Sequence, residues 1–262
     1  MIKARVLCAA LLVLACGPAV AHASERTKLG VAFKPYQLGQ DTTITSTFEM
    51  WTTNGELPAP AIEFELRFPA NLVFSTSGLG LAICHPAVLE ARGVHGCSPN
   101  ARIGEGSALV VVPFGPERVQ ERTKVTILKG PPQGGQIGIL LYSDGQTPVS
   151  AENFFQGELL ESNSFGELLE TAIPLIPTVP GASDVVITRA EVAIGSNGLT
   201  YYKHEHGKTV GYHPRGFQVP ETCPPGGFRF DLSVQFAGGT VVPATDTIPC
   251  PVSHRRHHGG KR

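Results

Sequence analysis

The stretch FRFDLSVQFAGGTVVPATDTI, residues 228–248, begins with nine positions that alternate between apolar and polar side chains. Successive side chains of a β-strand point to opposite faces, so this alternation predicts a strand with one buried and one solvated face. Gly238-Gly239 then supplies a two-residue turn of the kind that β-hairpins favour, and residues 241–248 lead back toward Cys250. The stretch therefore predicts an antiparallel hairpin.

The same alternation recurs nearer the N-terminus, where Phe64, Leu66 and Phe68 alternate with Glu63 and Glu65. We expect the two glutamates to lie on a solvent face. Further strands are predicted near residues 31–34, 42–50, 108–112, 122–129, 136–142, 154–160, 184–194 and 199–203. Helix signals are short and fall at residues 85–92 and 165–171.

Composition favours the same class of fold. The chain has 30 Gly and 22 Pro, and only 16% of its residues are charged, which suits many turns and few helices. Strands without crossover helices predict antiparallel sheets, so the sequence predicts an all-β protein built as an antiparallel β-sandwich. We expect one β region at residues 24–115 and a second at 116–252, either as two packed domains or as one continuous domain.

Residues 29–76 resemble a bacterial Ig-like extracellular domain. The resemblance rests on the threonine-rich run 42–47 and on LRFPANLVF, residues 66–74, which is similar to a strand ending of such modules. Residues 60–252 also resemble uncharacterised secreted proteins of actinobacterial type, which share a segment like CSPNARIGEGSA, residues 97–108. The resemblances imply an Ig-like β-sandwich and an extracellular location, and they imply no activity.

Residues 1–23 have the pattern of an export signal, with a positively charged start, a short apolar run and the cleavage site Ala21-His22-Ala23. The mature chain would begin at Ser24, would be secreted, and would contain no transmembrane span. The alternative is a lipid anchor at the cell surface through Cys16, because the residues before it partly match a bacterial lipobox.

Four cysteines follow the predicted signal, and export favours their oxidation to disulfides. Four cysteines allow three pairings. We expect neighbours to pair, Cys84 with Cys97 and Cys223 with Cys250, so that the second disulfide joins the two ends of the predicted hairpin. A zinc site at the first pair competes in principle, but its spacing matches no common zinc finger.

Residues 253–262 form a basic tail that we expect to be disordered, and residues 254–262 contain four Lys and Arg. Such a tail either solvates the end of the chain or contacts an anionic surface.

The sequence contains no Gly-x-Ser-x-Gly, His-Glu-x-x-His or Gly-x-x-x-x-Gly-Lys motif. The best polar group is His204, His206 and His213, which could bind a metal ion if a turn brought His213 toward the other two. The alternative interpretation is an ordinary polar surface loop. The neighbouring tyrosines are candidates for a ligand-binding aromatic face: Tyr201, Tyr202 and Tyr212.

We therefore expect an exported, non-enzymatic protein without a cofactor, which acts as a cell-surface or extracellular structural or binding module. Its candidate partners are cell-wall polymer or carbohydrate, with no specific recognition of nucleic acid. The alternative is a secreted metal-dependent enzyme, or a metal-binding protein, that uses the three histidines.

Overall fold

The computed structural model describes residues 24–70, 72, 78–114, 117–146, 150–161, 166–177, 184–195 and 198–251. The predicted export signal, Cys16 and the basic tail lie outside the described residues. The described helices are α1 (Pro86–Arg92) and the short 3₁₀ turns η1 (Gly93–Gly96) and η2 (Pro99–Ala101). The described strands are β1 (Glu25–Lys34), β2 (Asp41–Thr52), β3 (Ala61–Arg67), β4 (Arg102–Phe114), β5 (Glu117–Lys129), β6 (Ile137–Gly145), β7 (Ala151–Glu161), β8 (Glu167–Ala172), β9 (Val186–Ile194), β10 (Tyr201–Glu205), β11 (Lys208–Tyr212), β12 (Phe217–Gln218), β13 (Phe228–Phe236) and β14 (Val241–Ile248).

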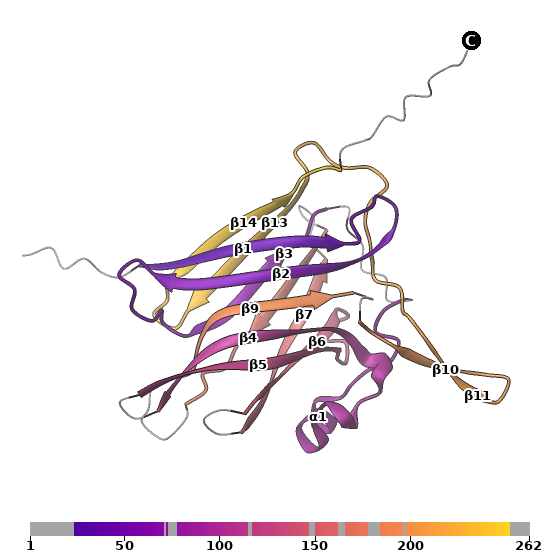
Figure 1. The fold of residues 1–262 in the computed structure, drawn as a ribbon, viewed down its shortest axis with the longest axis horizontal. Coiled ribbons are helices and arrows are strands. Elements are labelled where there is room, and N and C mark those ends of the chain that lie inside the picture. The colour runs from indigo at the N-terminus through magenta and orange to yellow at the C-terminus, as the bar shows by residue number, and fades with distance from the viewer. Residues whose placement is uncertain are drawn as a thin grey trace, which may run out of the picture.

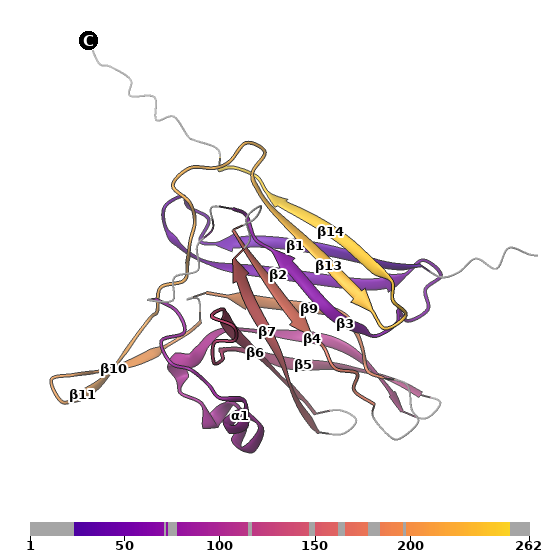
Figure 2. The same cartoon turned by 180° about the vertical axis from the view of Figure 1, so that it is seen from behind.

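Most of these strands form one antiparallel sheet in the order β1-β2-β9-β4-β5-β6-β7-β8-β3-β13-β14, and β12 pairs with β2 beside this path. Figure 1 shows β1, β2, β9, β4 and β5 on one side of the molecule, and Figure 2 shows β14, β13, β3, β7 and β6 on the other. The two end strands, β1 and β14, are in contact: the backbone N–H of Val31 donates a hydrogen bond to Asp246 Oδ2 at 2.7 Å. The sheet is therefore nearly closed on itself.

The predicted all-β class with few short helices is confirmed, whereas the Ig-like sandwich is not. Both predicted β regions contribute to the same sheet: β9 lies between β2 and β4, and β3 lies between β8 and β13. The hairpin at Gly238-Gly239 is confirmed, since β13 pairs with β14 and Gln235 lies opposite Val241.

The two predicted helices have different outcomes. The helix at residues 85–92 is confirmed as α1, but the prediction of a helix at 165–171 is wrong, because residues 167–171 belong to β8. Leu169 pairs with Leu66 of β3 on one side and with Leu159 of β7 on the other. In so short an apolar run, helix and strand periods cannot be told apart, and pairing with two neighbouring strands decides the structure.

The alternation on β13 places one row of its side chains in the core. Phe228, Phe230, Val234 and Phe236 are 0% exposed and Leu232 is 2% exposed. The ring of Phe230 lies 5.8 Å from that of Phe68 and 6.0 Å from that of Phe33, centroid to centroid. Aromatic side chains therefore fill the interior beside the strands that close the sheet.

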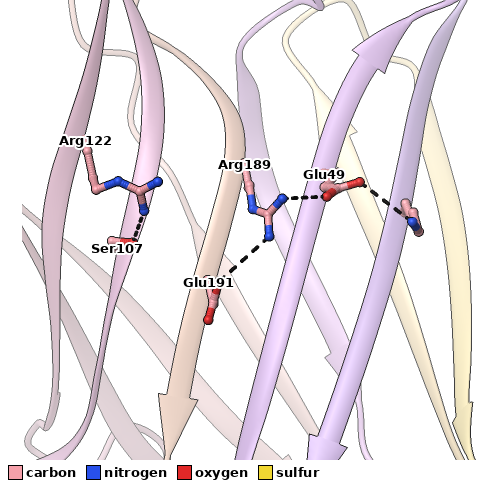
Figure 3. A network of polar contacts seen from close by, with 6 residues as sticks. Glu49, Ser107, Arg122, Arg189 and Glu191 are labelled. Carbon is pink, nitrogen blue, oxygen red and sulfur yellow. Dashed lines mark hydrogen bonds and ion pairs between the residues drawn. The ribbon is translucent and has the colours of Figure 1, made fainter.

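A row of polar side chains crosses β2, β9, β4 and β5 on their outer face, as Figure 3 shows. Arg189 of β9 contacts Glu49 of β2 at 2.9 Å and Glu191 of its own strand at 3.8 Å. Farther along the same face, Arg122 of β5 donates to Ser107 of β4 at 2.9 Å. These exposed contacts each contribute little to stability, and they show that the opposite rows of the same strands face inward.

Two disulfides hold segments outside the sheet, and both pairings expected from the sequence are confirmed. Cys84–Cys97 encloses α1, and this segment packs Cys84 and Leu89 against the outer side of β5 and β6 at Leu128 and Leu140. Cys223–Cys250 joins the chain before β13 to the chain after β14. Disulfides of this kind persist in oxidising environments outside the cytoplasm.

Candidate functional site

The interior of the sheet contains an apolar cavity of about 300 Å³. Its wall includes Ala108 and Val110 of β4 and Ala190 and Val192 of β9. Ala108 lies directly opposite Ala190 in the β4–β9 ladder. Small side chains lie side by side on this part of the wall, whereas β13 contributes Leu232 to the lining and its buried phenylalanines pack in the core beside the cavity.

Part of the cavity lining, in the segment that follows β8, is exposed at the protein surface. Ile173 to Pro177 contribute to its wall, and Leu175 in this segment is 47% exposed. The volume lies at the lower end of the range of roughly 300–1,000 Å³ that small-molecule sites occupy. An apolar cavity of this size suits an apolar ligand better than it suits water.

A group of polar side chains interrupts this lining on three neighbouring strands, and we call it the polar wall: Glu121 and Thr123 of β5, Ser143 of β6 and Asn153 of β7. Ser143 lies directly opposite Asn153 in the β6–β7 ladder. Glu121 is 8% exposed, and its carboxylate accepts a hydrogen bond from the backbone N–H of Gln146. A side chain at Gly145 would crowd this carboxylate, since a Cβ there would lie 3.1 Å from Glu121 Oε1.

The Thr123 side chain has a buried polar atom that forms no hydrogen bond. The residue is 6% exposed, and its Oγ1 atom is buried without a hydrogen-bond partner. Buried hydroxyls in folded proteins nearly always have a partner, so this atom calls for an explanation.

The sequence contains a signal for this polar wall, although it matches no motif. Along residues 119–127, charged or amide side chains at 120, 122 and 124 alternate with Thr123, Val125 and Ile127. That alternation places Glu121 on the inward row, so a carboxylate inside an apolar sheet could have been predicted from the pattern.

The tyrosines predicted to bind a ligand do not share an exposed face. Tyr201 on β10 is 0% exposed, its hydroxyl accepts from the backbone N–H of Gly80 at 2.8 Å, and it donates to the carbonyl oxygen of Arg102. Burial raises the pKa of the Tyr201 phenol. The Tyr212 ring meets Tyr201 edge-on at 6.1 Å, whereas Tyr202 is 48% exposed. Tyr201 therefore holds the β10–β11 hairpin to the sheet and is not available to a ligand.

Replacing Tyr201 with Phe is expected to lower the free energy of unfolding by about 1–3 kcal/mol, because the buried Gly80 N–H loses its acceptor. Urea unfolding of the purified variant measures this change. Tyr202→Phe on the same strand is the matched control and should unfold like the original chain. Equal stability of both variants would contradict the anchoring role of Tyr201.

The three candidate histidines lie on or beside the same hairpin. His204 Nδ1 contacts Thr209 Oγ1 at 3.3 Å, His206 lies at the turn with a φ of 51°, and His213 Nδ1 contacts the carbonyl oxygen of Leu199 at 3.0 Å. Among the described residues, no three His, Cys, Asp or Glu side chains lie close enough together to hold a metal ion. The structure thus brings these histidines onto one hairpin but not into one ligand set.

Glu63 and Glu65 belong to an acidic row on the outside of the sheet. Glu170 of β8 lies opposite Glu65 of β3 and also opposite Glu158 of β7. Desolvation raises the pKa of the Glu170 carboxyl, and the charges of Glu63, Glu65 and Glu158 raise it further. Because the folded state then binds this proton more tightly than the unfolded state, ionised Glu170 destabilises the fold at neutral pH.

Replacing Glu170 with Gln is expected to stabilise the protein at neutral pH by less than about 1 kcal/mol, since the group is exposed. The gain in stability should decrease as the pH falls through the raised pKa of Glu170, and it should disappear below 4.5, the ordinary pKa of a glutamate. At such a pH the Glu170 carboxyl of the original chain is protonated in both the folded and the unfolded state. Urea unfolding near pH 7 and near pH 4 tests this, with Glu90→Gln on α1 as the control. A gain that stays constant with pH would contradict the electrostatic cause.

Within the described ranges, no helix is long and apolar enough to cross a membrane. Comparison of the chain with known protein families, with curated proteins and with solved structures finds no match.

Proposed function

We propose that this protein is an exported, non-enzymatic binding protein that holds an apolar small molecule inside its nearly closed sheet. The observation that carries the proposal is the cavity of about 300 Å³ between β4, β9 and the strands that face them. Sheets that close on themselves often keep such a space for one small ligand.

The chemistry of the lining selects the kind of ligand. Burying apolar surface contributes roughly 25 cal/mol for each Å² removed from water, so an alkyl chain or a flat hydrocarbon would gain from entering. A carbohydrate would lose the water that solvates its hydroxyls and find few partners among alanine, valine and isoleucine side chains. We therefore propose an apolar small molecule as the ligand, in place of the cell-wall polymer or carbohydrate expected from the sequence.

Export is part of the proposal and has two supports. Residues 1–23 have the composition of an export signal, and both disulfides belong to an oxidising environment. A carrier outside the cell would need to shield an apolar ligand from water, and a cavity inside the sheet would do so.

Titration of the purified protein with the neutral fluorescent probe N-phenyl-1-naphthylamine tests the binding function. We expect the probe to become fluorescent at a stoichiometry of one per chain, and dodecan-1-ol to displace it competitively. The proposal would be contradicted if the fluorescence of the probe did not rise above that seen with a protein without such a cavity. It would also be contradicted if no alkyl compound displaced the probe.

A further inference from the structure

The polar wall contains four of the polar side chains that line the mainly apolar cavity, and its residues come from three adjacent strands. The other two polar side chains of the lining are Ser46 of β2 and Thr171 of β8. Glu121 and Thr123 are two positions apart on the same face of β5, which places their Cα atoms about 7 Å apart. Ser143 and Asn153 lie on the next two strands. A ligand that fills the cavity would therefore be apolar along most of its length and would find most of the hydrogen-bonding side chains at the polar wall.

Thr123 is the residue of this wall whose polar side-chain atom is fully buried and has no hydrogen-bond partner. Its Oγ1 atom is buried and unpaired, although the side chain belongs to the cavity lining. A threonine hydroxyl can donate one hydrogen bond and accept others, so a ligand oxygen placed beside it would satisfy a group that is otherwise desolvated at a cost.

The charge of the lining restricts what that ligand oxygen can be. Among the described side chains that form the cavity there is no Lys, Arg or His, and the acidic one is Glu121. A carboxylate head would enter without a cationic partner and would face the Glu121 carboxylate, which disfavours binding in a medium of low dielectric constant.

We propose, on the basis of the binding function above, that the ligand is a neutral amphiphile with a hydroxyl head, and that the cavity rejects the matching fatty acid. The Thr123 hydroxyl donates to the oxygen of the ligand hydroxyl. The ligand O–H in turn donates to an acceptor of the polar wall, and the alkyl chain extends along Ala108, Val110 and Val125.

Competition with the same fluorescent probe at neutral pH tests this inference with three compounds of equal chain length: dodecan-1-ol, dodecanoate and dodecane. We expect the alcohol to bind at least about tenfold more tightly than the carboxylate. The alcohol O–H can donate a hydrogen bond that a carboxylate cannot, and the alcohol avoids the repulsion between a charged head and Glu121. Glu121→Gln should reduce this preference by improving the binding of dodecanoate.

Two threonine variants identify the residue responsible. Thr123→Val should weaken dodecan-1-ol about fivefold and leave dodecane unchanged, because only the hydroxyl is removed. It should not lower the urea midpoint of the free protein, since that hydroxyl has no partner within the protein. Thr171→Val on β8, another threonine of the cavity lining, is the matched control and should not change the binding of the alcohol.

The outcomes separate the two proposals. Equal affinities for alcohol and carboxylate, or an unchanged affinity of Thr123→Val for the alcohol, would overturn the head-group inference and leave the binding function standing. Failure of all three compounds to displace the probe would overturn both.

Discussion

The variant Ala108→Phe is expected to weaken the binding of dodecan-1-ol by about 100-fold or more, which corresponds to about 2.7 kcal/mol. Ala108 lines the cavity and lies opposite Ala190, so a phenylalanine ring there would occupy the space that the ligand needs. Because the ring enters existing space, the urea midpoint of the free protein should stay the same or rise. Isothermal titration of the purified variant measures the affinity.

Ser107→Phe is the matched control, since it adds the same ring at the preceding position of β4. The Ser107 side chain lies on the outer face, where it accepts a hydrogen bond from Arg122, so the ring would project away from the cavity. Unaltered binding by Ala108→Phe, or equal losses in the two variants, would show that the ligand does not occupy the interior beside β4.

The variant Phe230→Ala is expected to lower the free energy of unfolding by about 3–5 kcal/mol. The Phe230 side chain is 0% exposed, and its ring packs against those of Phe33 and Phe68. Its removal leaves a new void in the part of the interior that is filled, beside the strands that close the sheet. Urea unfolding with a fixed transition slope measures the loss.

Phe230→Leu keeps most of the volume and should cost less than half as much as the alanine variant. A loss below about 1 kcal/mol for Phe230→Ala would mean that the aromatic cluster is not the stabilising core. The pair of variants thus distinguishes the packed part of the interior from the hollow part, where Ala108→Phe should be tolerated.

The alternation in single strands predicted much of this fold. The pattern of Phe228 to Phe236 identified a strand, its buried row and the hairpin that follows it, because these features depend on neighbouring residues. The pairing of Cys223 with Cys250 followed from the same hairpin. The segment 165–171 shows the limit of such patterns, since its strand forms only through pairing with β3 and β7.

The closure of the sheet could not be predicted from the sequence, because it depends on pairings between segments that are distant in the chain. β9 lies between β2 and β4 in the sheet. β1 and β14, which are the first and last strands of the described chain, contact each other. Alternation shows that Ala108 and Ala190 point inward, but it does not show that they lie side by side on neighbouring strands. No local motif marks the cavity, because its lining comes from many strands.

The sequence indicated tyrosines and histidines as site residues because of their chemistry, and the fold places them on or beside the β10–β11 hairpin, outside the cavity lining. Tyr201, the most buried of them, anchors a hairpin, while His204 and His206 lie at that hairpin's exposed end. Glu121 and Thr123 could not be recognised as site residues, because a single acid and a single hydroxyl match no sequence motif. Their role becomes visible only when the closed sheet places them in the cavity lining.

A crystal structure of the protein with bound 12-bromododecan-1-ol is the most direct test of the central claim that the cavity holds an apolar ligand. Bromine scatters anomalously, so its position can be located independently of the rest of the ligand. The account predicts a bromine peak inside the sheet, surrounded by the apolar side chains of β4, β5 and β9. Bromine found only on the outer surface, or a cavity closed by its own side chains, would contradict it.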